Sequence, residues 1–504
     1  MDIITILPEI LVCLTALTII GVDLLLKAEQ KTGKLAFVTG LGLLISLGVS
    51  LGLRSAGFEG SSAGFNGAFM PDQMTWFFRV ALLISSVLTL MLSIDYVQNK
   101  LRHPGEFYAL LCLATLGAMF LVASTEILTF YLSLELLSIS SFVLVALRKD
   151  QPRSAEASIK YLIFGAISSA LLLYGFSLIF GITGNLQYAE ISHYLQEAGS
   201  QFVYQANPDL PTPQDQHLKL ELLVALLMIL GGLSYKIAAV PFHMWAPDVY
   251  EGAPLPVTAF LSASSKLAGF AALMRIVDMF ATREMTPIWV RILIGLAVLS
   301  MCYGNLVAIA QQNVKRLFAY SSIAHAGYLL MGVIALSENH SRDTAMVALC
   351  YYLLVYVLMN LGAFSAIIYF ASQAQSTRLQ DWAGLGRRSP WFGFVMICCL
   401  LSLTGLPPFA GFTGKFYLFG AVAEMGPSYL WLVLIGVLNS VVSLYYYSRI
   451  IKVLFFAQSG EAATQESGHP ALLLASMMSF AGIFLLFVFP NWVINWVSQI
   501  GTLI

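Results

Sequence analysis

The feature that most constrains this chain is a series of apolar segments, each long enough to cross a lipid bilayer. The hydrocarbon core is ~30 Å thick, and an α-helix crosses it in about 20 residues. Inside lipid, a helix satisfies its own backbone hydrogen bonds. We therefore predict an all-α polytopic membrane protein with about fourteen transmembrane helices by this length criterion. They lie near residues 4–26, 33–53, 74–97, 106–123, 125–147, 155–181, 220–246, 256–276, 287–309, 314–336, 342–372, 391–424, 428–457 and 470–497.

Composition supports this class and excludes others. Of the 504 residues 58% are hydrophobic and only 11% are charged, whereas soluble proteins carry about 25% charged residues. The net charge of −1 gives no reason to expect a nucleic-acid partner. The first segment lacks the basic region of a cleavable signal, and no soluble domain is visible, so we expect 1–504 to form a single integral membrane domain.

Basic residues gather on one side of the predicted topology. The pairs Arg148–Lys149, Lys315–Arg316 and Arg387–Arg388 all fall in loops that follow odd-numbered segments. Cytoplasmic loops of membrane proteins carry such an excess of lysine and arginine. We therefore predict that these loops are cytoplasmic and that both termini lie outside.

Two segments are interrupted by proline, at Pro241 and at Pro407–Pro408. Proline removes a backbone donor and breaks a helix, and a broken helix with a buried cation is typical of a transporter's ion site. The interrupted stretches LSYKIAAVPFH and LSLTGLPPFAG lie five segments apart. We therefore predict two inverted five-helix repeats, in residues 106–280 and 285–457, with broken helices 7 and 12. Residues 1–105 and 470–504 would supply the remaining helices.

Two buried charges lie in the first predicted repeat. Glu135 lies near the middle of segment 125–147, ~15 Å from either surface at 1.5 Å per residue. Lys236 lies about one turn before Pro241. Moving a carboxylate relative to a buried lysine can switch the lysine between binding and releasing a proton. The alternatives are a protonated Glu135 bonded to another helix and an ion pair that locks the kink.

Three further groups lie at similar depth in later segments. Lys266 stands among serines in FLSASSKLAGF, His325 lies in YSSIAHAGY, and Lys415 follows the second break. Intramembrane ionisable residues are functional candidates by default, although a lone histidine is as often a satisfied core residue. Together with Glu135 and Lys236 they predict a proton relay parallel to the membrane.

Other polar groups allow two interpretations. Lys160 is a candidate relay residue, but it lies only about five residues into its segment and could extend to the cytoplasmic surface. His243, Asp248 and Glu251, in PFHMWAPDVYEGAP, could form a proton uptake route or cap helices equally well. The acids near segment ends are expected to be interfacial. These are Glu9, Asp23 and Glu126.

Connecting segments and cysteines suggest no separate chemistry. Residues 187–219 are predicted to form an outside loop with one short helix at Ala189–Glu197, and 458–469 a cytoplasmic linker. The six cysteines lie in apolar runs without metal-binding spacing, so we expect them to be packing residues and expect no metal or cofactor site.

Long stretches around these residues resemble the antiporter-like subunits of proton-pumping NADH:quinone oxidoreductase, respiratory complex I, and among them subunit N. They cover most of residues 125–420. These stretches are SLELLSISSF, EASIKYLIFGAISSALLLYG, KIAAVPFHMWAPDVYEGAP, SASSK, AYSSIAHAGY and LTGLPPFAGFTGKF. The lysine at 415 argues against subunit M, where glutamate is expected, and the lack of a long lateral helix argues against subunit L.

The resemblance implies a proton-translocating subunit that holds no cofactor. It implies that Glu135 pairs with Lys236, that Lys266 and His325 continue a hydrated axis, and that Lys415 ends it. NAD, FMN, iron–sulfur clusters and quinone are expected in partner subunits. The implied partners are other complex I membrane subunits, including neighbouring antiporter-like ones, within the bacterial inner membrane or, for a photosynthetic type, the thylakoid membrane.

Three other functions remain open at this point. The chain could be a subunit of a multi-subunit Na⁺/H⁺ antiporter, which uses a related fold. It could belong to a photosynthetic complex driven by ferredoxin. It could also be a structural membrane subunit whose charges only fix helix packing.

Overall fold

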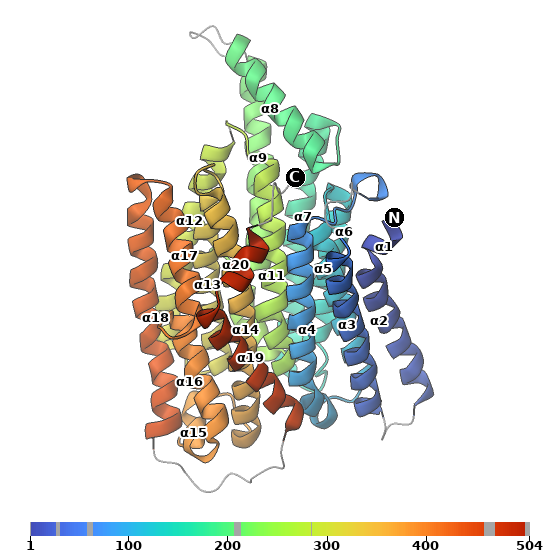
Figure 1. The fold of residues 1–504 in the computed structure, drawn as a ribbon, viewed down its shortest axis with the longest axis vertical. Helices are drawn as coiled ribbons and strands as arrows, with labels where there is room; N and C mark the ends of the chain where they lie inside the picture. Colours follow the sequence, from blue (N-terminus) through green and yellow to red (C-terminus); the bar gives the residue numbers. More distant parts are fainter. Residues whose placement is uncertain are drawn as a thin grey trace.

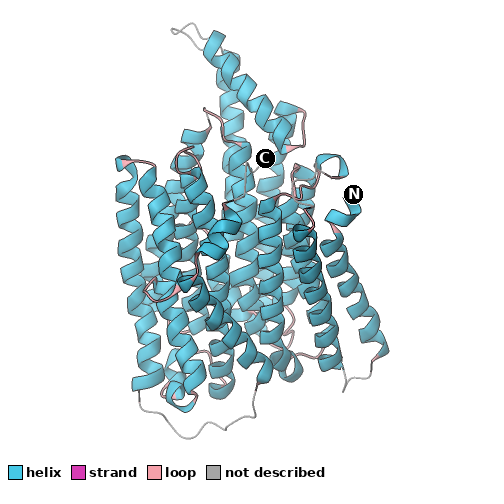
Figure 2. Cartoon of the chain, in the orientation of Figure 1, coloured by secondary structure: helices cyan, strands magenta, loops and turns pink. Residues whose placement is uncertain are grey.

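The computed structural model describes residues 2–26, 31–57, 64–205, 213–283, 285–457 and 469–498. These residues form a bundle of upright helices (Figure 1) joined by short loops, as Figure 2 shows. Thirteen of the described helices are long and apolar enough to cross a membrane. The pair α16 and α17 adds a fourteenth, broken span, so the predicted all-α membrane architecture is confirmed.

Most helix bounds follow the predicted segments closely. The exceptions are segment 220–246, whose helix begins at Pro213, and segment 470–497, whose helix ends at Val488 and is followed by a short separate helix. The spans are α2 (Leu7–Leu25), α3 (Lys31–Ser55), α4 (Gln73–Lys100), α5 (Pro104–Ala123), α6 (Ile127–Val145), α7 (Pro152–Thr183), α9 (Pro213–Ile237) with α10 (Trp245–Gly252), α11 (Leu255–Met279), α12 (Thr286–Ala310), α13 (Val314–Ala335), α14 (Arg342–Ala374), α16 (Pro390–Thr404) with α17 (Ala410–Glu424), α18 (Leu430–Phe456) and α19 (Pro470–Val488). The short helices are α1 (Asp2–Thr5), α8 (Tyr188–Gln205), α15 (Leu385–Arg388) and α20 (Asn491–Val497), with 3₁₀ turns η2 (Phe65–Gly67), η3 (Leu379–Trp382) and η4 (Pro427–Tyr429).

Local sequence explains where many of these helices start and stop. Proline opens α5, α7, α16 and α19, since the first helical position needs no backbone donor. The Asp72 carboxylate caps α4 by accepting a 2.7 Å hydrogen bond from the Thr75 amide. Glycines in the left-handed conformation end α7 and α16 at Gly184 and Gly405.

The segment predicted as an outside loop is largely helical, and that prediction was wrong. Helix α8 spans Tyr188–Gln205 rather than Ala189–Glu197, and α9 already begins at Pro213. Figure 1 shows α8 and the start of α9 projecting above the bundle. The polar composition of α8 reflects this exposure, which the membrane-length criterion cannot distinguish from a loop. The predicted linker 458–469 lies outside the described residues except for His469.

Both predicted breaks are present. Helix α9 ends at Ile237 and the chain resumes as α10 at Trp245, while α16 ends at Thr404 and α17 begins at Ala410. Each break contains a cis X–Pro peptide bond, Val240–Pro241 and Pro407–Pro408.

Helix packing repeats between the two halves. Helix α5 packs on α6 as α12 packs on α13, and α7 packs on α9 as α14 packs on α16 and α17. Glycine permits the close approach of α5 to α6 and of α12 to α13. A Cβ on Gly117 of α5 would lie 2.6 Å from the Leu137 amide nitrogen of α6, and one on Gly304 of α12 would lie 2.6 Å from the Ala324 amide nitrogen of α13. The two five-helix units therefore use the same packing device.

Helices α11 and α13 form the centre of the bundle. Their apolar windows are wholly buried inside the protein, whereas those of α18 and α19 are mostly exposed. They are also the least apolar of the thirteen described spans. A helix without a lipid-facing side can carry polar residues around its whole circumference, and these two helices carry Lys266 and His325.

One acid predicted to be interfacial is a member of a buried ion pair instead. Glu9 of α2 is fully buried, and Arg79 Nε donates to its Oε1 at 2.8 Å. Arg275 of α11 donates to Asp72 at 2.8 Å. The interfacial assignment of Glu9 was wrong because pairing across helices, which a single segment cannot reveal, removes the need for water.

The Glu9–Arg79 pair gives a prediction about stability. Arg79→Leu should destabilise the protein by about 3–5 kcal/mol, because it leaves a buried carboxylate without its counter-charge. Glu9→Leu combined with Arg79→Leu should recover much of this loss, since neither charge is then buried alone. Thermal unfolding of the purified, detergent-solubilised complex measures both effects. A double variant no more stable than Arg79→Leu alone would contradict this account.

Candidate functional site

In the first predicted pair, Lys236 is hydrogen-bonded to a serine on the helix that carries Glu135. Lys236 is 4% exposed in the last turn of α9, and its Nζ donates a 3.0 Å hydrogen bond to Ser138 Oγ of α6. Ser138 lies one turn after Glu135 on the same helix. Among the described residues no acid lies within ion-pair distance (4.0 Å) of Lys236, and Glu135 Oε1 is buried without a hydrogen-bond partner. The carboxylate and the ammonium are therefore neighbours that do not touch.

Lys236 and Lys266 lie on packed helices. Gly269 of α11 faces the end of α9, where an added Cβ would lie 3.0 Å from Ile237 Cγ2 and 3.5 Å from Lys236 Cγ. Gly269 follows Lys266 by one turn. The stem of Lys236 is therefore packed beside the helical turn that carries Lys266.

Lys266 is in contact with α13 and α14. It is 2% exposed, and its Nζ donates to the Ser322 carbonyl of α13. The same Nζ lies 5.8 Å from the ring centroid of Tyr356 in α14, within the range of a cation–π interaction. Ser322 precedes His325 by about one turn, so this contact brings Lys266 close to the buried histidine.

His325 lies among three tyrosines. Its Nδ1 is hydrogen-bonded to Tyr352 Oη at 2.7 Å. Its ring centroid lies 5.2 Å from Tyr356 and 5.5 Å from Tyr328. Tyr356 is therefore placed between Lys266 and His325, and Tyr328 is placed on the side that faces α17.

Lys415 ends the series. Its Nζ lies 4.5 Å from the Tyr328 ring centroid and donates to the Thr404 carbonyl at 2.9 Å and to Ser440 Oγ of α18 at 3.0 Å. Thr404 is the last residue of α16, as Lys236 lies in the last turn of α9. Lys415 lies after its break and reaches back across it, so the two ammonium groups are both at the end of the first half of a broken helix.

These residues form one row, which we call the central row: Glu135, Lys236, Lys266, His325 and Lys415. The row runs from α6 at the right of Figure 1, through α9 and α11, to α13, α14 and α17 towards the left. Buried lysines held only by hydroxyls, carbonyls and aromatic rings can exist with or without a proton at modest cost. The arrangement is therefore suited to proton transfer along the membrane plane.

The tyrosines that contact the central row were not predicted from the sequence. Tyr352, Tyr356 and Asn360 follow one another at four-residue spacing within α14, which places three polar groups on one face of an apolar helix. That spacing was the available signal. Aromatic residues are so common in membrane spans that the pattern carries little weight without a charged neighbour.

The ring of Tyr328 gives a prediction at this end of the row. Tyr328→Leu should slow proton transfer several-fold, because it removes a cation–π contact to Lys415 worth about 1–2 kcal/mol when desolvated. Tyr328→Phe keeps the ring and should stay close to the wild-type rate, although it loses the hydrogen bond from Asn305. Proton translocation per electron in proteoliposomes distinguishes them. Equal losses in both variants would assign the effect to the hydroxyl instead.

Lys160 lies outside the central row. Its side chain is 38% exposed and is paired with Asp248 and Glu156, each at 2.7 Å. Arg316 also donates to Asp248 at 2.7 Å. The Asp248 carboxylate is therefore paired with two cations at once, Lys160 and Arg316.

Glu251 and His243, the other polar groups of the stretch PFHMWAPDVYEGAP, lie in two different environments. The Glu251 carboxylate contacts Arg316 at 3.1 Å and Arg153 at 3.6 Å. His243 lies in the first break with its ring 4.7 Å from that of Tyr303, and its Nδ1 is buried without a partner. Asp248 and Glu251 are therefore members of an ion-pair network near the start of α13.

Metal-binding clusters and disulfides do not account for any of this polarity. Within the described ranges, no group of three histidine, cysteine or acidic residues could hold a metal ion. All six cysteines are free thiols, of which Cys13 and Cys302 are partly exposed.

Comparisons with known proteins agree on one family. The model described as "NADH:quinone oxidoreductase/Mrp antiporter, TM" matches residues 124–443. NADH-quinone oxidoreductase subunit N of Moorella thermoacetica is 41% identical over 488 residues, which cover 97% of this chain and 96% of that protein. NAD(P)H-quinone oxidoreductase subunit 2 of Synechocystis sp. is 42% identical over 469 residues, covering 93% and 85%.

A solved structure also has this fold. A chain of respiratory complex I from Thermus thermophilus with bound aureothin has a TM-score of 0.77 and 29% identity. The match covers 97% of this chain and 99% of that one. The shared fold therefore extends over nearly the whole of both chains.

Proposed function

Because this chain belongs to the transmembrane family shared by NADH:quinone oxidoreductase and Mrp antiporters, as an antiporter-like subunit of the subunit N type, we propose that it translocates protons through the central row. It does so as a non-redox subunit of NADH:quinone oxidoreductase. The observation that carries the proposal is the chain of contacts from Lys266 through Tyr356, His325 and Tyr328 to Lys415.

The central row provides several sites that bind a proton moderately, in place of a single site that binds it strongly. A single charge inside hydrocarbon costs several kcal/mol. Lys236, Lys266 and Lys415 each have oxygen acceptors within reach, and this lowers the cost of the charged form. When one neutral amine gains a proton and becomes an ammonium, repulsion favours release of a proton from the next ammonium. A shift of the Glu135 carboxylate relative to Lys236 would start this sequence.

Membership of the family also supports proposals about partner subunits and about orientation in the membrane. We propose that NAD, FMN, iron–sulfur clusters and quinone are bound by partner subunits and that neighbouring antiporter-like subunits flank this one. The loops that follow odd-numbered spans face the cytoplasm, because basic residues accumulate there, so both termini lie outside. Lys160, which is half-exposed and paired with Asp248, organises the ion-pair network and does not relay protons.

Experiments can distinguish NADH:quinone oxidoreductase from two related assemblies, an Mrp-type antiporter and a complex driven by another electron donor. Purification of the tagged chain should recover a hydrophilic arm with flavin and iron–sulfur clusters, and NADH oxidation by that complex should acidify one side of a vesicle. Sodium-dependent proton exchange without redox partners would instead assign the chain to an Mrp-type antiporter. The similarity to the Synechocystis protein makes a complex driven by a different electron donor the other candidate, and activity with reduced ferredoxin but not NADH would identify it.

A further inference from the structure

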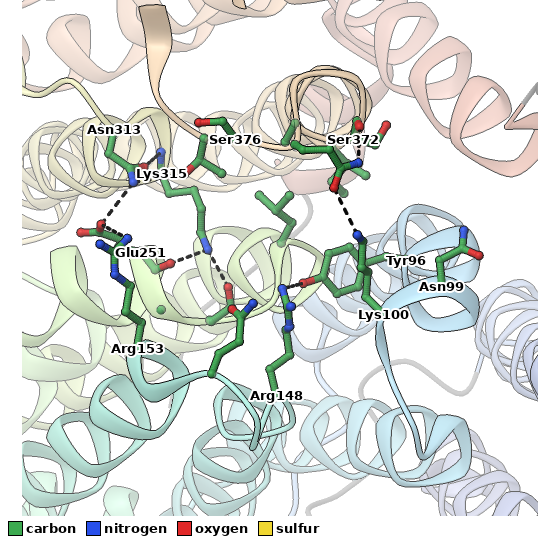
Figure 3. A pocket seen from close by; sticks show the side chains of 18 of the residues that line it. Tyr96, Asn99, Lys100, Arg148, Arg153, Glu251, Asn313, Lys315, Ser372 and Ser376 are labelled. Carbon is green, nitrogen blue, oxygen red and sulfur yellow. Dashed lines mark hydrogen bonds and ion pairs between the residues drawn. The ribbon is translucent and has the colours of Figure 1, made fainter. Parts of the chain in front are cut away.

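A cup of about 890 Å³ opens on the face that carries the loops after odd-numbered spans. Figure 3 shows that side chains from several elements point into it. They come from the ends of α4 and α14, the starts of α7, α13 and α19, and the junction between α10 and α11. The basic residues in its lining outnumber the acids Asp95 and Glu251. The basic residues of the lining are Lys100, Arg148, Arg153, Lys315 and Arg378.

Lys315 differs from the other basic residues of the cup because it is buried. It is 5% exposed, and its Nζ donates 2.6 Å hydrogen bonds to the carbonyls of Glu251 and Ala253. The Glu251 carboxylate is directed to Arg153, Arg316 and Asn313 instead. Among the described residues no carboxylate lies within 4.0 Å of this ammonium, which makes its environment like that of the central-row lysines.

The segment that binds Lys315 also contacts the central row. Tyr250 directly precedes Glu251, and its Oη is hydrogen-bonded to Ser322 Oγ at 3.2 Å. The Ser322 carbonyl accepts the hydrogen bond from Lys266. Seven residues separate Lys315 from Ser322, so both lie on one face of α13, two turns or ~10 Å apart.

We propose that Lys315 is a further proton-carrying residue, which connects the cup to Lys266 through the hydroxyls of Tyr250 and Ser322. This inference rests on the proposed proton translocation. A hydronium ion in the water of the cup gives a proton to the neutral Lys315 amine: one O–H bond breaks, one N–H bond forms, and water remains. The proton then leaves as that bond breaks and passes along water and the two hydroxyls, each of which accepts one proton and donates another, to the amine of Lys266.

A purely structural Lys315 would need only its charge and its two carbonyl bonds. Arginine keeps both, but it does not give up its proton in proteins. Lys315→Arg therefore separates a structural cation from a proton carrier. Tyr250→Phe is a second, smaller test, because it removes only the hydroxyl that reaches Ser322. Lys452→Arg, at an exposed lysine near the end of α18, is the matched control.

The experiment measures protons translocated per electron in proteoliposomes of the intact complex, with assembly checked by native electrophoresis. Lys315→Arg and Tyr250→Phe should assemble normally and lose this subunit's proton translocation at least tenfold, as Lys266→Ala does, whereas Lys452→Arg should match the wild type. If Lys315→Arg fails to assemble, Tyr250→Phe decides alone. Wild-type translocation in Tyr250→Phe, or in an assembled Lys315→Arg, together with loss in Lys266→Ala, would overturn the role of Lys315 and leave the central row intact. Wild-type translocation in Lys266→Ala as well would overturn the proposed function itself.

Discussion

Lys266→Ala is expected to abolish proton translocation by this subunit while the assembled complex still reduces quinone. Lys266 is the group that connects the Lys236 side of the row to His325. Without it, a proton must cross the packed centre of α11 without a stabilising partner, at a cost of about 3 kcal/mol or more. Each 1.4 kcal/mol is about tenfold in rate, so transfer should slow by a factor of about a hundred or more.

Lys266→Arg is the informative partner of that variant. If Lys266→Arg translocates protons and Lys266→Ala does not, the fixed charge matters more than release of the proton from this residue. If both fail with assembly intact, Lys266 itself carries the proton. Proton-to-electron ratios in proteoliposomes report the difference. Full translocation in the assembled Lys266→Ala complex would refute a role in the relay.

Glu135→Ala and Lys236→Ala should each reduce translocation by a similarly large factor. The two groups act on each other across Ser138, without direct contact. Residues that act as one unit show non-additive losses, so the double variant should be no worse than either single one. Ser138→Ala should cost no more than either of these, because it removes one hydrogen bond worth about 1.5–3 kcal/mol when a charge is involved.

The same proteoliposome assay measures this set, with complex content as its control. Independent, additive losses would show that Glu135 and Lys236 serve separate steps. Full proton pumping per electron in either single variant would mean that the proposed relay does not begin at this pair.

Much of the fold could be predicted because the bilayer sets the length of each span. Most segment boundaries, within a few residues, follow from apolar length, and both breaks follow from Pro241 and Pro407–Pro408; the start of α9 and the end of α19 do not. The projecting helix α8 could not be predicted by that criterion, because it lies beyond the spans. The burial of Glu9 was likewise not predicted, since its pairing with Arg79 depends on how α2 and α4 meet in space.

The candidate site could be predicted in its charges but not in its connections. Depth alone identified the members of the central row, since a charge in mid-span has few explanations. The sequence left Lys160 open, since it lies only about five residues into its segment, and its exposed pairing with Asp248 now separates it from the central row. Lys315 was assigned to a loop because it begins α13, yet the carbonyls of the α10–α11 junction cover it. These differences arise from tertiary packing.

The wholly buried helices α11 and α13 have a consequence for biogenesis. A span enters the membrane from the translocon according to its own hydrophobicity, and a central lysine or arginine opposes this by about 2.5–3.5 kcal/mol. Helix α11 contains both Lys266 and Arg275 and, with α13, is the least apolar of the described spans. These two helices therefore depend on earlier-inserted neighbours to be retained in the bilayer during synthesis. The polarity needed for proton transfer makes the order of insertion part of how this protein folds.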